Sequence, residues 1–158
     1  MTTKKALAFV SFLRANKMEF IRGDGYWANQ YYWYVRYMGK DVCYILVNGT
    51  GEEKESAPLA VWSETSDGSD GAWYENNSLD EHTKEIAWDN VDFCAKCTPG
   101  SPCYGGMHKT VFGKEFDGVC RCTFRFDKPN DCELECIKKL VVVIKSDINS
   151  KSVKENDK

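Results

Sequence analysis

The segment that most constrains this chain is Cys94-Ala-Lys-Cys97-Thr-Pro-Gly-Ser-Pro-Cys103. It places three thiols within ten residues and interleaves them with two prolines and a glycine. These residues exclude a helix and favour tight turns. A loop bent in this way can direct several sulfurs at one centre, as a structural zinc site requires. The segment therefore predicts thiolate ligation of zinc.

Two residues compete to be the fourth zinc ligand. Side chains alternate along a strand expected near Val119–Phe126, which puts Cys120 and Cys122 on one face. Cys120 lies nearer the loop end of the hairpin and is the first candidate, while Cys122 is flanked by phenylalanines and is interpreted as a buried small hydrophobe. His108, five residues after Cys103, is the alternative. The expected ligand set is Cys94, Cys97, Cys103 and Cys120.

The other cysteines have different expected roles. Cys43 stands in a hydrophobic strand and is predicted to be a core residue. Cys132 and Cys136 are four residues apart on a predicted helix, so they share a face roughly opposite its apolar stripe. Either another element covers that face or both thiols are exposed.

The pattern of elements predicts an α+β fold, with an antiparallel sheet of about five strands and three helices packed mainly on one face. The helices are expected at 3–17, at 79–91 behind a Ser78–Glu81 capping box, and from Asn130 onward. The strands are expected at Gln30–Met38, Val42–Asn48, Leu59–Ser63, Lys109–Phe112 and Gly118–Phe126.

The third helix has the clearest amphipathic pattern in the chain. Its apolar residues recur at spacings of three and four, at Leu134, Ile137, Val141, Ile144 and Ile148. From Asn149 onward the sequence is polar and is expected to fray. This pattern predicts one globular domain over residues 1–148 and a C-terminal tail over 149–158.

The aromatic strand before Met38 carries two different faces. Trp33, Val35 and Tyr37 share one parity and form the more apolar set, which is assigned to the core. The opposite set, assigned to a more open face, is Tyr32, Tyr34 and Arg36. This set is the candidate binding surface for a small apolar or planar ligand.

Composition excludes some classes of protein. The net charge of −3 and the pI near 5.5 argue against a nucleic-acid binder, which usually has a basic footprint. No stretch approaches the roughly 20 apolar residues that span a bilayer, so no membrane association is expected. The apolar run Ala6–Leu13 imitates a signal peptide but lacks a clear cleavage site. A cytoplasmic protein is therefore predicted.

Two other function classes use the same cysteines. A thiol-based redox enzyme or sensor would use Cys94 and Cys97, although this pair follows a helix rather than opening one, which is the wrong context for a thioredoxin-like site. A secreted protein stabilised by disulfides is the third possibility. No phosphate-binding, metalloprotease or paired-carboxylate motif is present, so an enzyme is not favoured. The leading hypothesis is a non-enzymatic binding or sensor domain with a structural zinc loop.

Three segments together resemble a family of small cysteine-rich bacterial proteins, mostly from anaerobic Gram-positive species, with no established activity. They are Trp33–Cys43, the Cys94–Cys103 loop and Phe112–Cys120. The resemblance covers most of residues 9–148. It implies a cytoplasmic bacterial domain and favours Cys120 as the fourth ligand, and it contributes no catalytic residue.

Overall fold

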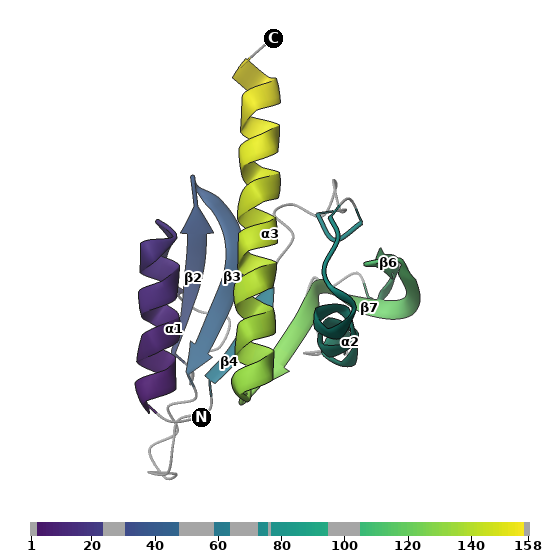
Figure 1. Ribbon diagram of the computed structural model, residues 1–158, viewed down its shortest axis with the longest axis horizontal. Coiled ribbons are helices and arrows are strands. Elements are labelled where there is room, and N and C mark those ends of the chain that lie inside the picture. Colours follow the sequence, from purple (N-terminus) through teal and green to yellow (C-terminus); the bar gives the residue numbers. More distant parts are fainter. Residues whose placement is uncertain are drawn as a thin grey trace.

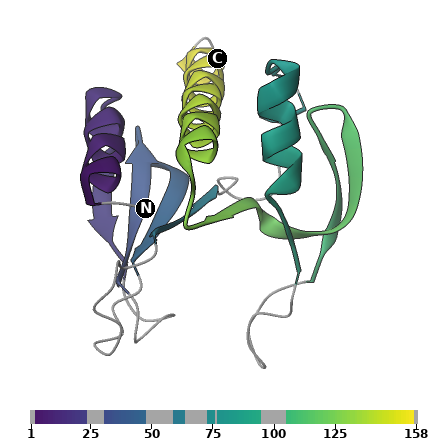
Figure 2. The ribbon, with the colours of Figure 1, turned by 60° about the horizontal axis from the view of Figure 1, so that its bottom comes forward.

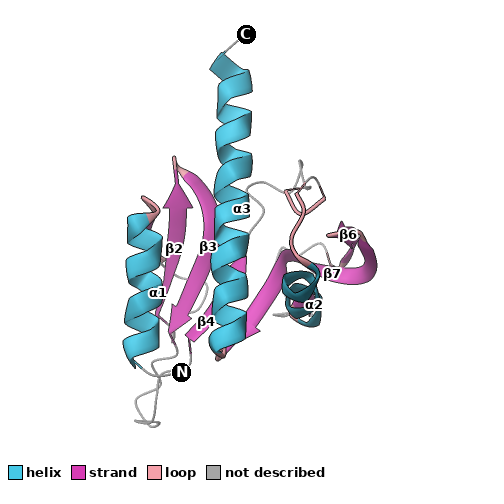
Figure 3. Cartoon of the chain, viewed as in Figure 1, coloured by secondary structure: helices cyan, strands magenta, loops and turns pink. Residues whose placement is uncertain are grey.

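A computed structural model describes residues 3–23, 31–47, 59–63, 73–75, 77–94 and 105–156. The described residues form three helices and seven strands (Figures 1 and 3). In chain order these are α1 (Thr3–Ala15), β1 (Glu19–Arg22), β2 (Tyr31–Tyr37), β3 (Lys40–Val47), β4 (Leu59–Ser63), α2 (Glu81–Asp89), β5 (Val91–Phe93), β6 (Met107–Val111), β7 (Lys114–Asp127) and α3 (Asp131–Asn156). The prediction of an α+β fold is confirmed.

All the strand pairs are antiparallel, and β7 joins two parts of the sheet. The strand order is β1-β2-β3-β4-β7-β5, with β6 also paired to β7. The last residues of β7 pair with β4, whereas its first residues form a hairpin with β6. This hairpin curls up beside α2 (Figure 2). A single long strand therefore connects the β1–β4 ladder to the region that carries the cysteine loop.

The expected strands are all present, but the described residues contain two more than the five predicted. Strand β1 has only four residues and β5 only three, too few for an alternating pattern to stand out. Strand β5 follows α2 almost directly, so the helix expected over 79–91 ends instead at Asp89.

Two tight turns fix the register of the hairpins. Met38 and Gly39 between β2 and β3, and Phe112 and Gly113 between β6 and β7, all have positive φ. Two consecutive residues of positive φ define a type I′ turn, whose twist matches that of paired strands. The second turn comes earlier than expected, so β7 begins at Lys114 rather than Gly118.

The three helices stand side by side on the same side of the strands (Figure 2). They contribute to one main cluster of buried residues, which includes Phe9 and Leu13 from α1, Ala87 from α2, and Val35 and Phe124 from the sheet. None of the helices in the described parts of the chain is long and apolar enough to cross a membrane.

Helix α3 confirms the predicted amphipathic pattern, since Leu134, Ile137, Val141, Ile144 and Ile148 are all buried. It begins with a reciprocal capping box, in which Asn130 and Glu133 each accept a hydrogen bond from the other's backbone N–H. The helix continues to Asn156, beyond the tail boundary expected at Asn149, and runs past the ends of β2 and β3 (Figure 1).

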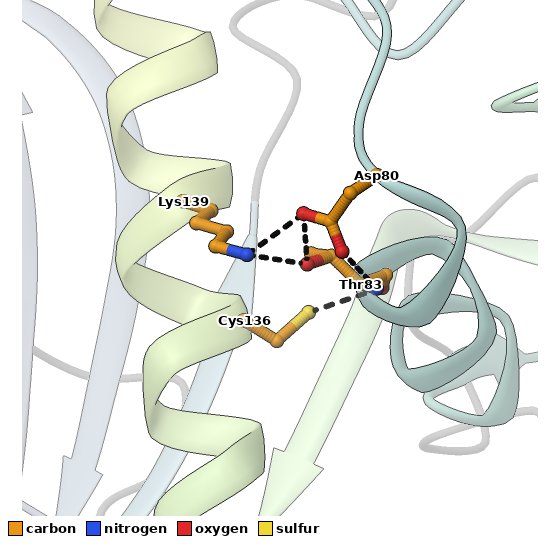
Figure 4. A network of polar contacts seen from close by, with 4 residues as sticks. All are labelled: Asp80, Thr83, Cys136 and Lys139. Carbon is orange, nitrogen blue, oxygen red and sulfur yellow. Dashed lines mark hydrogen bonds and ion pairs between the residues drawn. The ribbon is translucent and has the colours of Figure 1, made fainter.

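Helix α2 is capped by Asp80 rather than by Ser78. The Asp80 carboxylate accepts hydrogen bonds from the backbone N–H and the hydroxyl of Thr83. Lys139 of α3 donates to both Asp80 and Thr83, and the Cys136 thiol donates to the Thr83 carbonyl (Figure 4). This network fixes the start of α2 against α3. It also buries Cys136, one of the two cysteines for which the sequence did not decide between burial and exposure.

Candidate functional site

Both ends of the cysteine loop lie against the same residue of β7. The backbone N–H of Cys94 donates a 2.8 Å hydrogen bond to the carbonyl oxygen of Gly118. On the other side of the loop, a methyl group at Gly106 would lie 2.5 Å from the Gly118 backbone, so the two glycines allow a close approach of main chains. Both ends of the loop therefore contact β7 at a point two residues before Cys120.

The backbone of Cys94 lies beside the residues that precede Cys120 on β7. Val91 and Val119 both pack into the main core. Cys120 is buried and Cys94 is half-buried. Burial raises the pKa of Asp92, and the nearby Cys120 side chain opposes that shift.

The neighbouring Cys122 is the main reason that the pKa of Cys120 falls to about 7, against the opposing effects of burial and of Asp92. A lowered pKa favours the thiolate, which is the form that binds metals.

The strand is irregular at this point. Val91 pairs with Phe124 and Phe93 pairs with Val119, so four residues of β7 stand opposite Asp92 alone. We call these four residues, Cys120–Thr123, the β7 bulge. Thr123 has a φ of 56° and is fully buried. A β-branched residue rarely adopts a positive φ, so surrounding contacts must hold this conformation.

The Lys109 ammonium supplies these contacts from β6. It donates to the carbonyl oxygens of Cys120 and Arg121 at 3.0 and 3.1 Å, and to the Thr123 hydroxyl at 2.8 Å. Tyr74 also hydrogen-bonds to Thr123, and its ring centroid lies 5.9 Å from the ammonium. Burial lowers the pKa of Lys109, and the neighbouring cysteines oppose that shift. Lys109 therefore fixes the bulge from the core side.

The structure describes only part of the predicted zinc site. Cys94 and Cys120 are described, whereas Cys97 and Cys103 lie outside the described residues. The described residues contain no group of three or more cysteine, histidine or acidic side chains arranged to hold a metal. His108, the alternative ligand, is exposed and contacts Asp117 at 2.7 Å, a hydrogen bond that raises the pKa of His108.

The other described thiols differ sharply from Cys120. Cys43 is a core residue, as predicted, and burial raises its pKa to about 12. Cys136 is buried against α2, and burial likewise raises its pKa to about 12. Cys132 is exposed at the start of α3. Cys122 is half-buried in the bulge, so the prediction that it is a core hydrophobe is wrong.

The predicted ligand surface on β2 is separate from this site. Val35 and Tyr37 pack against the main core, whereas Tyr32 and Tyr34 belong to a second cluster with Tyr44 and Leu46, so the division into two faces is confirmed. The two faces differ less in exposure than expected, because Trp33, which was assigned to the core, is only half-buried.

On that second face Tyr32 is only 3% exposed, and its ring occupies the space where a side chain at position 23 would stand, so it offers little surface to a ligand. Tyr34 and Arg36 are half-buried. The Arg36 guanidinium lies 5.4 Å from the centroid of the Tyr34 ring and forms an ion pair with Asp41.

Sequence reasoning missed the β7 bulge and Lys109. One signal was available: Lys109 has the same strand parity as the core residue Val111, and a charge at an inward position of a strand requires polar partners. Nothing in the sequence identified those partners as backbone carbonyls of the neighbouring strand.

Comparisons with protein-family models, with curated proteins and with solved structures find no match to this chain. The argument for its function therefore depends on its own residues.

Proposed function

We propose that the protein is a non-enzymatic binding or sensor domain whose cysteine loop is held by a structural zinc ion. The ligands are the thiolates of Cys94, Cys97, Cys103 and Cys120. The observation that supports this proposal is the attachment of both loop ends at Gly118, two residues before Cys120 on β7. Four thiolates around one ion are a common structural zinc site.

The surroundings of Cys120 suit a metal ligand. A group that favours the thiolate of a ligating sulfur supports metal binding, and Cys122 lowers the pKa of Cys120. The buried Lys109 ammonium supplies a positive charge close to a site that would carry a net negative charge with four thiolates. These two features support Cys120 as the fourth ligand. His108, the alternative, is instead hydrogen-bonded to Asp117.

Zinc content tests this proposal. Protein purified under reducing conditions should contain one zinc per chain by native mass spectrometry. Changing Cys94, Cys97, Cys103 or Cys120 singly to Ser should release the ion and lower the melting temperature, because the binding energy of a structural ligand contributes to folding. Cys132→Ser, at an exposed thiol on α3, is the matched control and should keep its zinc. Equal zinc retention in all five variants would contradict the proposal.

We also propose that the binding function uses the exposed parts of Tyr34 and Arg36, with a small planar ligand as occupant. The Arg36 guanidinium lies over the Tyr34 ring, and a planar ligand could stack on the same two groups. The dye 1-anilinonaphthalene-8-sulfonate is a suitable planar probe. Tyr34→Leu and Arg36→Met should weaken its fluorescence enhancement, and Leu7→Val, at an exposed position of α1, should leave it unchanged. Equal enhancement in all the variants would exclude this surface.

A further inference from the structure

Three aromatic side chains gather where α2 meets the β6–β7 hairpin, and two of them contact one cation. The Lys114 ammonium lies over the rings of Trp88 and Phe116, at 5.1 and 5.2 Å from their centroids. The Phe93 ring adjoins Phe116, with 6.3 Å between the two ring centroids. The three rings come from α2, β5 and β7. We call Trp88, Phe93 and Phe116 the aromatic cluster.

Two of these rings are fixed by the fold, whereas Lys114 is at the surface. The Trp88 indole N–H donates a 2.7 Å hydrogen bond to the carbonyl oxygen of Val111. Trp88 and Phe116 are both partly buried and pack against the main core. Lys114 is exposed and follows the turn at Gly113, so its long side chain can move away without disturbing the core. The rings are therefore a permanent feature, and the lysine is a replaceable occupant.

The chemistry of the rings favours another kind of cation over a lysine. The face of an aromatic ring attracts a cation, and the attraction is weak where water still surrounds the cation. A primary ammonium at the surface keeps its water, because its three N–H groups donate hydrogen bonds. A quaternary ammonium has no N–H donor, so it leaves water more readily and contacts the rings through its methyl groups.

The arrangement exceeds what a purely structural contact requires. Lys138 of α3 gives a comparison, since its ammonium lies over one ring, that of Phe12. In the aromatic cluster one ammonium contacts two rings, and the adjoining Phe93 is 54% exposed. Fastening the hairpin to α2 does not depend on these contacts, because the hydrogen bond from Trp88 to Val111 already joins the two. The exposed Phe93 offers further apolar surface to a ligand.

We propose that the aromatic cluster binds a small quaternary ammonium compound, and that the Lys114 ammonium occupies the site when this compound is absent. Binding is non-covalent and requires the Lys114 side chain to move out from between the rings. Lys114 is therefore an internal competitor, which lowers the apparent affinity for the ligand. This proposal depends neither on the zinc ion nor on the Tyr34–Arg36 surface.

The indole N–H signals of the full-length protein give a local measurement. The chain has five tryptophans, and the loss of one signal in Trp88→Phe assigns that of Trp88. Choline chloride, added to nitrogen-15-labelled protein, should shift the Trp88 signal more than the other four. The matched probe is 3,3-dimethylbutan-1-ol, which has the shape of choline without its charge and should cause little shift. Equal shifts with the two probes would overturn recognition of the cation.

Two pairs of variants test the competition and the rings. Lys114→Ala should lower the Kd for choline about three- to six-fold, because it removes the competing ammonium. Lys4→Ala, which removes the same charge from an exposed position of α1, should leave the Kd unchanged. Phe116→Leu should weaken binding, whereas Phe12→Leu, at a ring that also lies under a lysine, should not. Melting curves check that all four variants fold.

The outcomes decide between the two parts of the proposal. No shift of the Trp88 signal in either the wild type or Lys114→Ala would overturn the site. A Kd in Lys114→Ala equal to or higher than that of the wild type would overturn the role of Lys114 as a competitor. Equal losses of affinity in Phe116→Leu and Phe12→Leu would show that choline binds elsewhere. Zinc content, measured separately, bears only on the zinc proposal.

Discussion

The two halves of β7 follow different rules. From Arg125 to Asp127 the strand pairs with β4 in regular register, and the buried Phe124 and Phe126 alternate with exposed Arg125. From Cys120 to Thr123 the alternation breaks, a threonine adopts a positive φ, and Lys109 of β6 binds the carbonyl oxygens of this stretch. The regular half builds the core, whereas the irregular half carries two cysteines on a strained backbone.

The two halves of this strand depend on different interactions. The regular half depends on apolar burial, which tolerates no polar group and offers no reactivity. The irregular half depends on a small set of polar contacts that hold a strained backbone. Substitutions in the two halves should therefore have separable effects on stability. We expect the largest loss of stability in the core and smaller losses toward the surface.

Phe126→Ala should have the largest effect on stability. The side chain is 2% exposed in the main core, and truncation of a buried phenylalanine costs about 3–5 kcal/mol through lost burial and a cavity. Urea unfolding of the variant measures this loss. Chains that remain folded should keep the proposed zinc ion. Loss of zinc in folded chains would mean that the two halves are coupled.

Lys109→Met should cost less stability but should disrupt the bulge. Removing the ammonium leaves buried carbonyl oxygens without a donor, an effect of about 1–3 kcal/mol. Zinc retention in competition with a chelator should fall, because the backbone that carries Cys120 is no longer held. Lys4→Met, on the exposed face of α1, is the control and should change neither quantity. Unchanged zinc retention in Lys109→Met would show that the bulge holds without its cation.

Gly106→Ala tests the base of the cysteine loop. The added methyl group would meet the Gly118 backbone at 2.5 Å, and overpacking of this kind costs about 1–3 kcal/mol. We expect weaker zinc binding in competition with a chelator, together with normal burial of the core. Gly105→Ala meets nothing within 4 Å but has a φ of 88°, so it reports backbone strain alone. Equal zinc affinity in the two variants would indicate that the close approach at Gly118 is unimportant.

The smallest effect is expected at the α2–α3 network, which lies outside β7. Hydrogen bonds from Lys139 and Thr83 lower the pKa of Asp80. A lowered carboxyl pKa contributes stability that is fully present above the unfolded pKa of 3.8 and is lost as the pH falls toward the folded pKa.

Lys139→Met should therefore flatten the loss of stability between about pH 5 and pH 2, as urea midpoints across that range would show. Lys138→Met, which removes an exposed pair with Glu135 on the same helix, is the matched control. An identical pH dependence of stability in the two variants would show that the contacts of Asp80 do not stabilise the fold.

The parts of the fold that were predictable from sequence are those where periodicity holds. The apolar stripe of α3, the hairpin turn after Tyr37 and the two faces of β2 follow from spacing alone. The bulge could not be predicted, because alternation was the assumption that placed Cys122 in the core. Its cause is a tertiary contact from Lys109, fourteen residues before Thr123, and no local pattern encodes such a contact.

The attachment of the cysteine loop at Gly118 has a thermodynamic consequence. Bringing the ends of a flexible segment together costs entropy that rises with its length. In this protein the strands meet that requirement, since Cys94 and Gly106 both lie against β7. The proposed zinc site would to that extent be preorganised, unlike a zinc finger that is unfolded without its metal. We therefore expect that chelation would empty the proposed site and leave a chain whose far-ultraviolet circular dichroism is nearly unchanged, so that metal occupancy could vary in a protein that stays folded.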